Sequence, residues 1–78
     1  MAELLAYLAR ELVDDPEAVR VEQEERDGAL VLVLRVAADD VGKVIGRQGR
    51  IARSLRTLVR ASAARDGRRV MVEIADPE

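Results

Sequence analysis

The chain has 78 residues, which suits one small domain covering residues 1–78. Cysteine and histidine are absent, which excludes disulfides, thiolate metal sites and the usual general base of an enzyme. Residues 1–40 carry four arginines against eleven carboxylates, a charge of −7, whereas residues 41–78 carry nine lysines or arginines against four carboxylates, a charge of +5. This asymmetry predicts a basic binding face in the second half; a surface that only keeps the domain soluble is the alternative.

The first half of the chain has the pattern of one helix followed by two strands. Apolar residues recur at helical spacing over residues 2–13, and Pro16 lies just beyond the expected end of that helix. Residues 19–24 alternate between apolar or neutral and charged side chains, as in a half-buried strand. The Asp-Gly pair at 27–28 is a hairpin turn signal, and the apolar run at 30–36 is typical of a central strand.

The second half has the pattern of two helices and a last strand. Asp39 or Asp40 is expected to cap a short helix that ends near Ile45. A longer amphipathic helix is expected at residues 49–64, and alternation predicts a strand at residues 70–74. The order helix, strand, strand, helix, helix, strand predicts an α+β fold, with a three-stranded mixed sheet and three helices on one face.

Two surface patterns leave alternatives open. Arginines recur on the polar side of the long helix, where a solvated outer face is favoured over a binding surface; they are Arg50, Arg53, Arg56 and Arg60. Val31, Val33 and Met71 fall on the sheet face opposite the expected core and are candidates for an exposed apolar patch that binds another protein. The aspartates at 14–15 and 39–40 lie beside helix ends, where turn or capping roles are favoured over a metal site.

The segment with chemical meaning is residues 44–50, Val-Ile-Gly-Arg-Gln-Gly-Arg. Its two glycines lack a Cβ, so a phosphate-bearing backbone can approach the main chain closely. The following helix begins here, and its free N–H groups and dipole favour an anion. Arg47 and Gln48 are placed to reach phosphate or sugar oxygens, with Lys43 and Arg50 beside them. The alternative is that the glycines make only a tight turn between helices.

A G-x-x-G sequence between two helices, preceded by an aliphatic pair and followed by Ile51, resembles the loop of the KH domain. The element order is similar to the type II arrangement, and the segments at residues 12–16 and 40–46 resemble the small bacterial KhpA family. The resemblance covers essentially the whole chain. It implies a cytoplasmic, non-enzymatic protein that binds single-stranded RNA as a chaperone or post-transcriptional regulator. It also implies a homodimer or a heterodimer with a larger, KhpB-like KH protein. A protein-interaction module with incidental RNA contact is the alternative.

The candidate RNA-binding residues combine this loop with an apolar groove and the loop before the last strand. Main-chain groups of that strand are candidates for reading base edges, and the single aromatic residue, Tyr7, lies far from the groove. No catalytic residue, metal or cofactor is predicted, and no segment is apolar enough to suggest a membrane partner. The candidate site residues are Lys43, Val44, Ile45, Gly46, Arg47, Gln48, Gly49, Arg50, Ile51, Arg68 and Val72.

Overall fold

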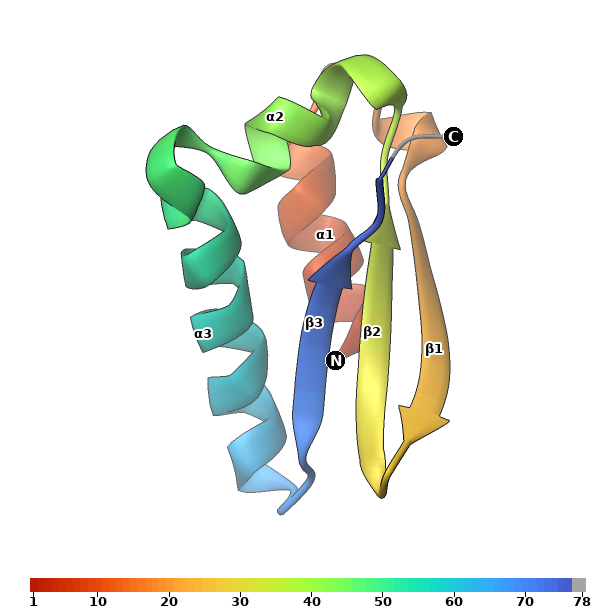
Figure 1. The fold of residues 1–78 in the computed structure, drawn as a ribbon, viewed down its shortest axis with the longest axis vertical. Helices are drawn as coiled ribbons and strands as arrows, with labels where there is room; N and C mark the ends of the chain where they lie inside the picture. The colour runs from red at the N-terminus through yellow and green to blue at the C-terminus, as the bar shows by residue number, and fades with distance from the viewer. Residues whose placement is uncertain (77–78) are drawn as a thin grey trace.

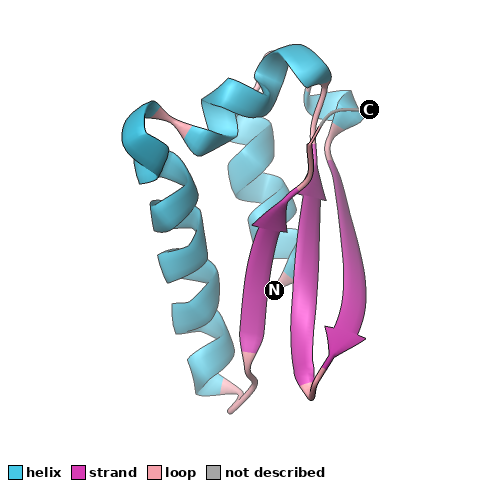
Figure 2. Cartoon of the chain, in the orientation of Figure 1, coloured by secondary structure: helices cyan, strands magenta, loops and turns pink. Residues whose placement is uncertain are grey.

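The computed structural model describes residues 1–76 and has the predicted order of helices and strands. Figure 2 shows the helices and strands in their two layers. Their ends lie within one residue of the predicted positions, except that the first strand ends two residues later, at Arg26, and single 3₁₀ turns at Pro16–Ala18, Ala38–Asp40 and Arg47–Gly49 fill the connections. The main elements are α1 (Ala2–Leu12), β1 (Arg20–Arg26), β2 (Ala29–Arg35), α2 (Val41–Ile45), α3 (Arg50–Arg65) and β3 (Val70–Ile74).

The sheet is mixed, as predicted, with strand order β1-β2-β3. β1 pairs with β2 antiparallel through a two-residue turn, in which Asp27 and Gly28 both have positive φ (51° and 80°). Positive φ at both central residues belongs to the turn type that matches the twist of a hairpin. β3 pairs with β2 in parallel because the α2–α3 crossover returns the chain to the same end of the sheet. β3 is therefore an edge strand.

The core lies between the sheet and the helices, which pack behind it and beside β3 (Figure 1). The inward side chains of β2 are all buried, as the alternating pattern predicts. Each fully buried Leu or Val contributes on the order of 1.5–3 kcal/mol relative to an exposed position. The largest of the fully buried apolar side chains are Leu5, Leu32, Leu34, Val31, Val44 and Val59.

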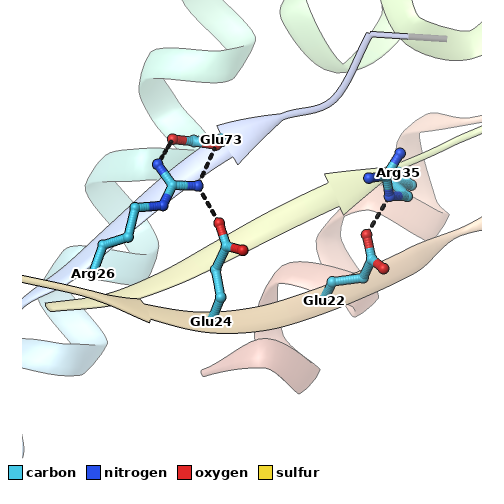
Figure 3. Close-up of polar contacts among 5 residues, drawn as sticks. All are labelled: Glu22, Glu24, Arg26, Arg35 and Glu73. Atoms are coloured by element: carbon cyan, nitrogen blue, oxygen red, sulfur yellow. Dashed lines mark hydrogen bonds and ion pairs between the residues drawn. The ribbon is translucent and has the colours of Figure 1, made fainter. Parts of the chain in front are cut away.

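The opposite sheet face does not carry the apolar patch that the sequence suggested. Met71 is exposed, but Val31 is completely buried although no helix covers it. Arg26 reaches from β1 across β2 and binds Glu73 on β3 through both terminal nitrogens, at 2.9 and 3.3 Å (Figure 3). Arg26 and Val31 line the same small depression, so the long arginine side chain covers the valine. The expectation of an exposed patch is therefore wrong at Val31.

Two further ion pairs continue this cover along the sheet face. Arg26 also pairs with Glu24, and Arg35 pairs with Glu22 (Figure 3). All five side chains come from strands: Arg26 pairs within β1 and, across β2, with β3, while Arg35 on β2 pairs with the neighbouring β1. The outer sheet face is thus a network of neutralised charges around a narrow apolar strip. Within residues 1–76, no helix has the length and hydrophobicity needed to cross a membrane.

Candidate nucleic-acid interface

The loop between α2 and α3 needs glycine at both ends, for different reasons. Gly46 has φ 75°, and a Cβ there would lie 2.6 Å from Cγ1 of Ile51, so packing alone excludes a larger residue. Gly49 has φ 72°, a left-handed conformation, but a Cβ on it would meet nothing within 4 Å. Gln48 also has positive φ (57°), which is uncommon for a residue with a side chain. The turn between the helices therefore explains Gly46, whereas the space over Gly49 is open.

The first turn of α3 presents main-chain N–H groups that no capping side chain satisfies. Gly49 is the N-cap residue and has no side chain to accept a hydrogen bond. The Arg47 side chain is exposed and forms no hydrogen bond or ion pair with any described residue, while Arg50 Nη2 donates to Oε1 of Gln48 at 3.2 Å. Unpaired cations beside a helix N-terminus attract an anion. This end of the molecule can hold a phosphate without breaking an ion pair.

Lys43, by contrast, already has two carboxylate partners. Its Nζ lies 2.8 Å from Oδ2 of Asp14 and 3.2 Å from Oδ1 of Asp40. Asp40 is only 2% exposed, and its carboxylate accepts hydrogen bonds from the main-chain N–H groups of Asp14 (3.2 Å) and Asp15 (3.0 Å). Asp40 is the N-cap residue of α2, as expected, but its side chain makes no capping hydrogen bond to that helix. The Asp40 carboxylate instead joins the start of α2 to the segment after α1, and Lys43 completes this cluster.

The protonation equilibria of the cluster follow from these contacts. Burial acts to raise the pKa of Asp40, but hydrogen bonds from the N–H groups of Asp15 and Asp14, together with the Lys43 ammonium, outweigh it and hold the pKa below its usual 3.8. Hydrogen bonds to Asp14 and then Asp40 raise the pKa of Lys43 above its usual 10.5. Asp40 and Lys43 are therefore both charged at neutral pH. Among the described residues, no group of three or more acidic side chains is arranged to hold a metal ion.

The apolar candidates do not form one surface. Val44 and Val72 are buried in the core, so their side chains are not available to bases. Ile51 is half-buried under Gly46 and lines a different cleft, between α1 and α3. Ile45 is 38% exposed at the end of α2, beside the loop. The structure thus brings residues 45–50 together at one surface and separates them from the remaining apolar candidates.

The side of α3 that faces β3 carries arginines that were expected to face solvent. Nε of Arg56 donates to the main-chain oxygen of Val72 at 3.3 Å, and Arg56 is half-buried, so the expectation of a solvated stripe is wrong at this residue. Further along, Arg60, Arg68 and Arg69 line a shallow cleft of about 360 Å³ between α3 and β3. Arg68 also lies 3.7 Å from Oε1 of Glu25. The helical period places Arg56 on the side of α3 that faces β3. Only the packing of α3 against β3 shows that its side chain contacts the strand and does not point into solvent.

Together, the element order, the mixed sheet and the glycine loop between two helices define a type II KH domain. The sequence comparisons give the particular family. The family described as "KhpA/KhpB, KH domain" matches residues 2–74, so the chain belongs to the KhpA/KhpB family of KH domains, which confirms the resemblance.

Relatives in several bacteria are similar to this chain over nearly its whole length, and each is named RNA-binding protein KhpA. The relative in Treponema pallidum is 55% identical over 74 residues, covering 95% of this chain and 92% of that protein. The one in Caldanaerobacter subterraneus subsp. tengcongensis is 49% identical over 74 residues, covering 95% and 99%. The one in Listeria monocytogenes (strain EGD-e) is 42% identical over 76 residues, covering 97% and 100%.

Proposed function

We propose that this chain is a non-enzymatic protein that binds single-stranded RNA and holds its phosphate backbone at Gly46–Gly49. The observation that carries the proposal is the loop itself. It combines open space over Gly49, uncapped N–H groups at the start of α3 and an exposed Arg47 with no partner among the described residues. The naming of the similar proteins as RNA-binding supports RNA as the ligand. A role as a cytoplasmic RNA chaperone or post-transcriptional regulator is consistent with binding that depends on backbone rather than on aromatic stacking.

The proposed RNA path runs from the loop along the α3–β3 side to Arg60, Arg68 and Arg69. Ten residues of α3 separate Arg50 from Arg60, a rise of about 15 Å. The cations at the two ends of this path are therefore spaced for a strand of a few nucleotides, rather than for one phosphate. A KH loop clamps four backbone nucleotides, which matches a path of this length.

The test is the double substitution Arg47→Asp with Gln48→Asp. Both side chains are exposed, and the positive φ of Gln48 is a conformation that Asp adopts more readily than most residues, so the fold should survive. We expect the free energy of unfolding to change by at most about 1 kcal/mol. RNA affinity should fall at least about 100-fold, because one cation is lost and two anions occupy the phosphate position. A thermal melt and an RNA titration on both proteins measure the two effects.

A matched control makes the same change of charge away from the loop. Arg10→Asp with Gln23→Asp alters two exposed positions on α1 and β1 and should leave RNA affinity within about twofold of wild type. Equal losses in both double variants would show that only net charge matters. Unchanged affinity in the loop variant would exclude the clamp at Gly46–Gly49. Substituting Gly46 is a poor probe, because Ala there would collide with Ile51 and disturb the fold as well.

A second role, pairing with another KH domain, is favoured by one surface. The cleft between α1 and α3 is almost wholly apolar, and two of its side chains are unusually exposed for leucine, Leu12 at 37% and Leu58 at 50%. We propose this cleft as the surface for a homodimer or for a heterodimer with a larger KH protein, in place of the sheet face that Arg26 covers. Sedimentation over a concentration series tests it. Wild type should self-associate, or bind its partner, and Leu58→Glu should not, while RNA binding at the loop is retained.

A further inference from the structure

The outer edge of β3, beside α3, carries main-chain groups that pair with no other strand. The N–H of Leu30 donates to the oxygen of Arg69, and the N–H of Ala75 donates to the oxygen of Leu34, both at 2.9 Å. Residues 69 and 75 therefore direct their main-chain groups toward β2. Because these groups alternate along a strand, the N–H and C=O groups of the even-numbered residues, Val72 among them, point away from β2. β3 has no other strand on that side, so no strand pairs with these groups, and α3 and its side chains lie over them instead.

Arg56 has taken the acceptor at the centre of that edge. Its Nε–H donates to the Val72 oxygen, and no carboxylate of the described residues pairs with it. The neighbouring arginines one turn away along α3, Arg53 and Arg60, are exposed and make no such main-chain bond. A guanidinium has five N–H donors in a planar fork and no acceptor. Once Nε is bound to Val72, the two Nη groups remain as donors over the edge of β3.

We infer that Arg56 is a specificity-determining residue, which converts the centre of the β3 edge from a hydrogen-bond acceptor into a donor. The inference rests on the proposed RNA-binding function. An unoccupied Val72 oxygen would select a base that presents an amino group, such as N4 of cytosine or N6 of adenine. With Arg56 in place, the edge selects a base that presents a carbonyl oxygen instead, such as O6 of guanine or the O4 of uracil. The commonest specific contact of arginine with a base in DNA is of this kind, with O6 and N7 of guanine as the acceptors.

Uracil and cytosine provide the cleanest test, because they share ring size and backbone and differ only at positions 3 and 4: uracil presents N3–H and a carbonyl oxygen, whereas cytosine presents an unprotonated N3 and an amino group. The probes are eight-nucleotide oligomers of uridine and of cytidine, titrated at one salt concentration. Wild type should bind the uridine oligomer about five- to tenfold more tightly. Arg56→Met keeps the aliphatic part of the side chain and frees the Val72 oxygen, so it should abolish or reverse this ratio.

Two further variants separate base selection from charge. Arg53→Met removes the same charge from the same helix, at an exposed position without a main-chain bond, and should weaken both oligomers equally with an unchanged ratio. Arg56→Lys keeps the charge but loses the fork, and should lower the ratio while retaining most of the affinity. It also serves as the second variant if Arg56→Met melts well below wild type.

Each outcome either supports or overturns the role inferred for Arg56. A uridine preference that is lost on Arg56→Met and kept on Arg53→Met supports the inference. Binding of both oligomers with equal affinity by wild type, or equal effects of the two methionine substitutions, would overturn it while leaving RNA binding intact. If wild type binds neither oligomer, the proposed RNA-binding function fails, and the role of Arg56 fails with it.

Discussion

Two groups of arginines in this molecule differ in whether the fold neutralises them. On the outer sheet face, Arg26 pairs with Glu24 and Glu73, and Arg35 pairs with Glu22 (Figure 3). Around the loop and the α3–β3 side, Arg68 pairs with Glu25, but no described residue forms an ion pair with the other arginines; these are Arg47, Arg50, Arg53, Arg56, Arg60 and Arg69. Net charge alone, which is −2, conceals this difference. A cation that lacks a carboxylate partner can bind phosphate without first losing an ion pair.

Lys43 shows why position in the sequence does not assign a cation to either group. It lies three residues before Gly46, yet its ammonium is held by Asp14 and Asp40. Any phosphate near Lys43 must compete with two carboxylates that already share its charge. Lys43 therefore belongs with the structural cations of the sheet face rather than with Arg47.

The largest predicted effect comes from removing Asp40, the buried carboxylate that binds Lys43. Asp40→Ala removes the acceptor for two main-chain N–H groups and leaves Lys43 with one partner. Losing two partly buried hydrogen bonds to a carboxylate, together with the packing of a buried side chain, is costly, so Tm should fall by roughly 5–15 °C, as measured by circular dichroism. Asp39→Ala, one residue earlier at an exposed position, is the matched control and should change Tm by at most about 3 °C. Equal melting of the two variants would contradict the structural role of Asp40.

The same carboxylate gives this prediction a pH dependence. The pKa of Asp40 lies below 3.8 in the folded protein, so the unfolded chain binds a proton more readily. Its stabilising contribution is present above pH 3.8 and is lost as the pH falls through the lower, folded pKa. The difference in Tm between wild type and Asp40→Ala should therefore be largest near neutral pH and shrink in strong acid. A difference that grows on acidification would show that the charged form is not the stabilising one.

A smaller effect, on the salt dependence of RNA affinity, distinguishes the two groups of arginines. If three or four phosphates are bound, log affinity for single-stranded RNA should fall with log salt with a slope near −2 to −3. Arg47→Gln should make the slope shallower by about 0.7, because one phosphate contact is lost. Arg26→Gln removes the same charge from the neutralised group and should leave the slope unchanged. Fluorescence titrations between about 50 and 300 mM salt measure both slopes; identical slopes for the two variants would contradict the comparison.

Periodicity and turn chemistry were enough to predict the order of elements, the mixed sheet and the inward face of β2. These features depend on neighbours in sequence: alternation at residues 30–34, the turn at 27–28 and the glycines at 46 and 49. The errors share a different cause. The contacts of Asp40 with Asp14, of Arg26 with Glu73 and of Arg56 with Val72 join residues 26, 47 and 16 positions apart. Which cation meets which partner across such a separation is set by the packing of elements, which no local pattern reports.

One signal in the sequence could have predicted that charged side chains cover the apolar strip on the outer sheet face. Strand register follows from the two-residue turn at 27–28, and it places Glu24 opposite Val31 and Glu22 opposite Val33. Charged residues beside valines on one face predict that long side chains lie over the apolar strip. The parallel register of β3, which brings Glu73 beside Val33, does not follow from a turn and needed the structure.

The smallest predicted effect concerns the ion pairs of the neutralised arginines on the outer sheet face. Glu73→Gln removes the carboxylate that Arg26 reaches across β2, but the pair is well exposed to solvent and Arg26 keeps Glu24. Tm should change by at most about 4 °C, and RNA affinity should not change, because this face lies on the other side of the sheet from α3. The hydrogen bond from Arg26 lowers the pKa of Glu73 below its usual 4.5, so the small stabilisation is present above that value and is lost as the pH falls through the folded pKa. The melting temperatures of wild type and Glu73→Gln should therefore converge in acid. A loss of RNA affinity in this variant would mean that the sheet face also contacts the ligand, and the division between neutralised and available arginines would then be wrong.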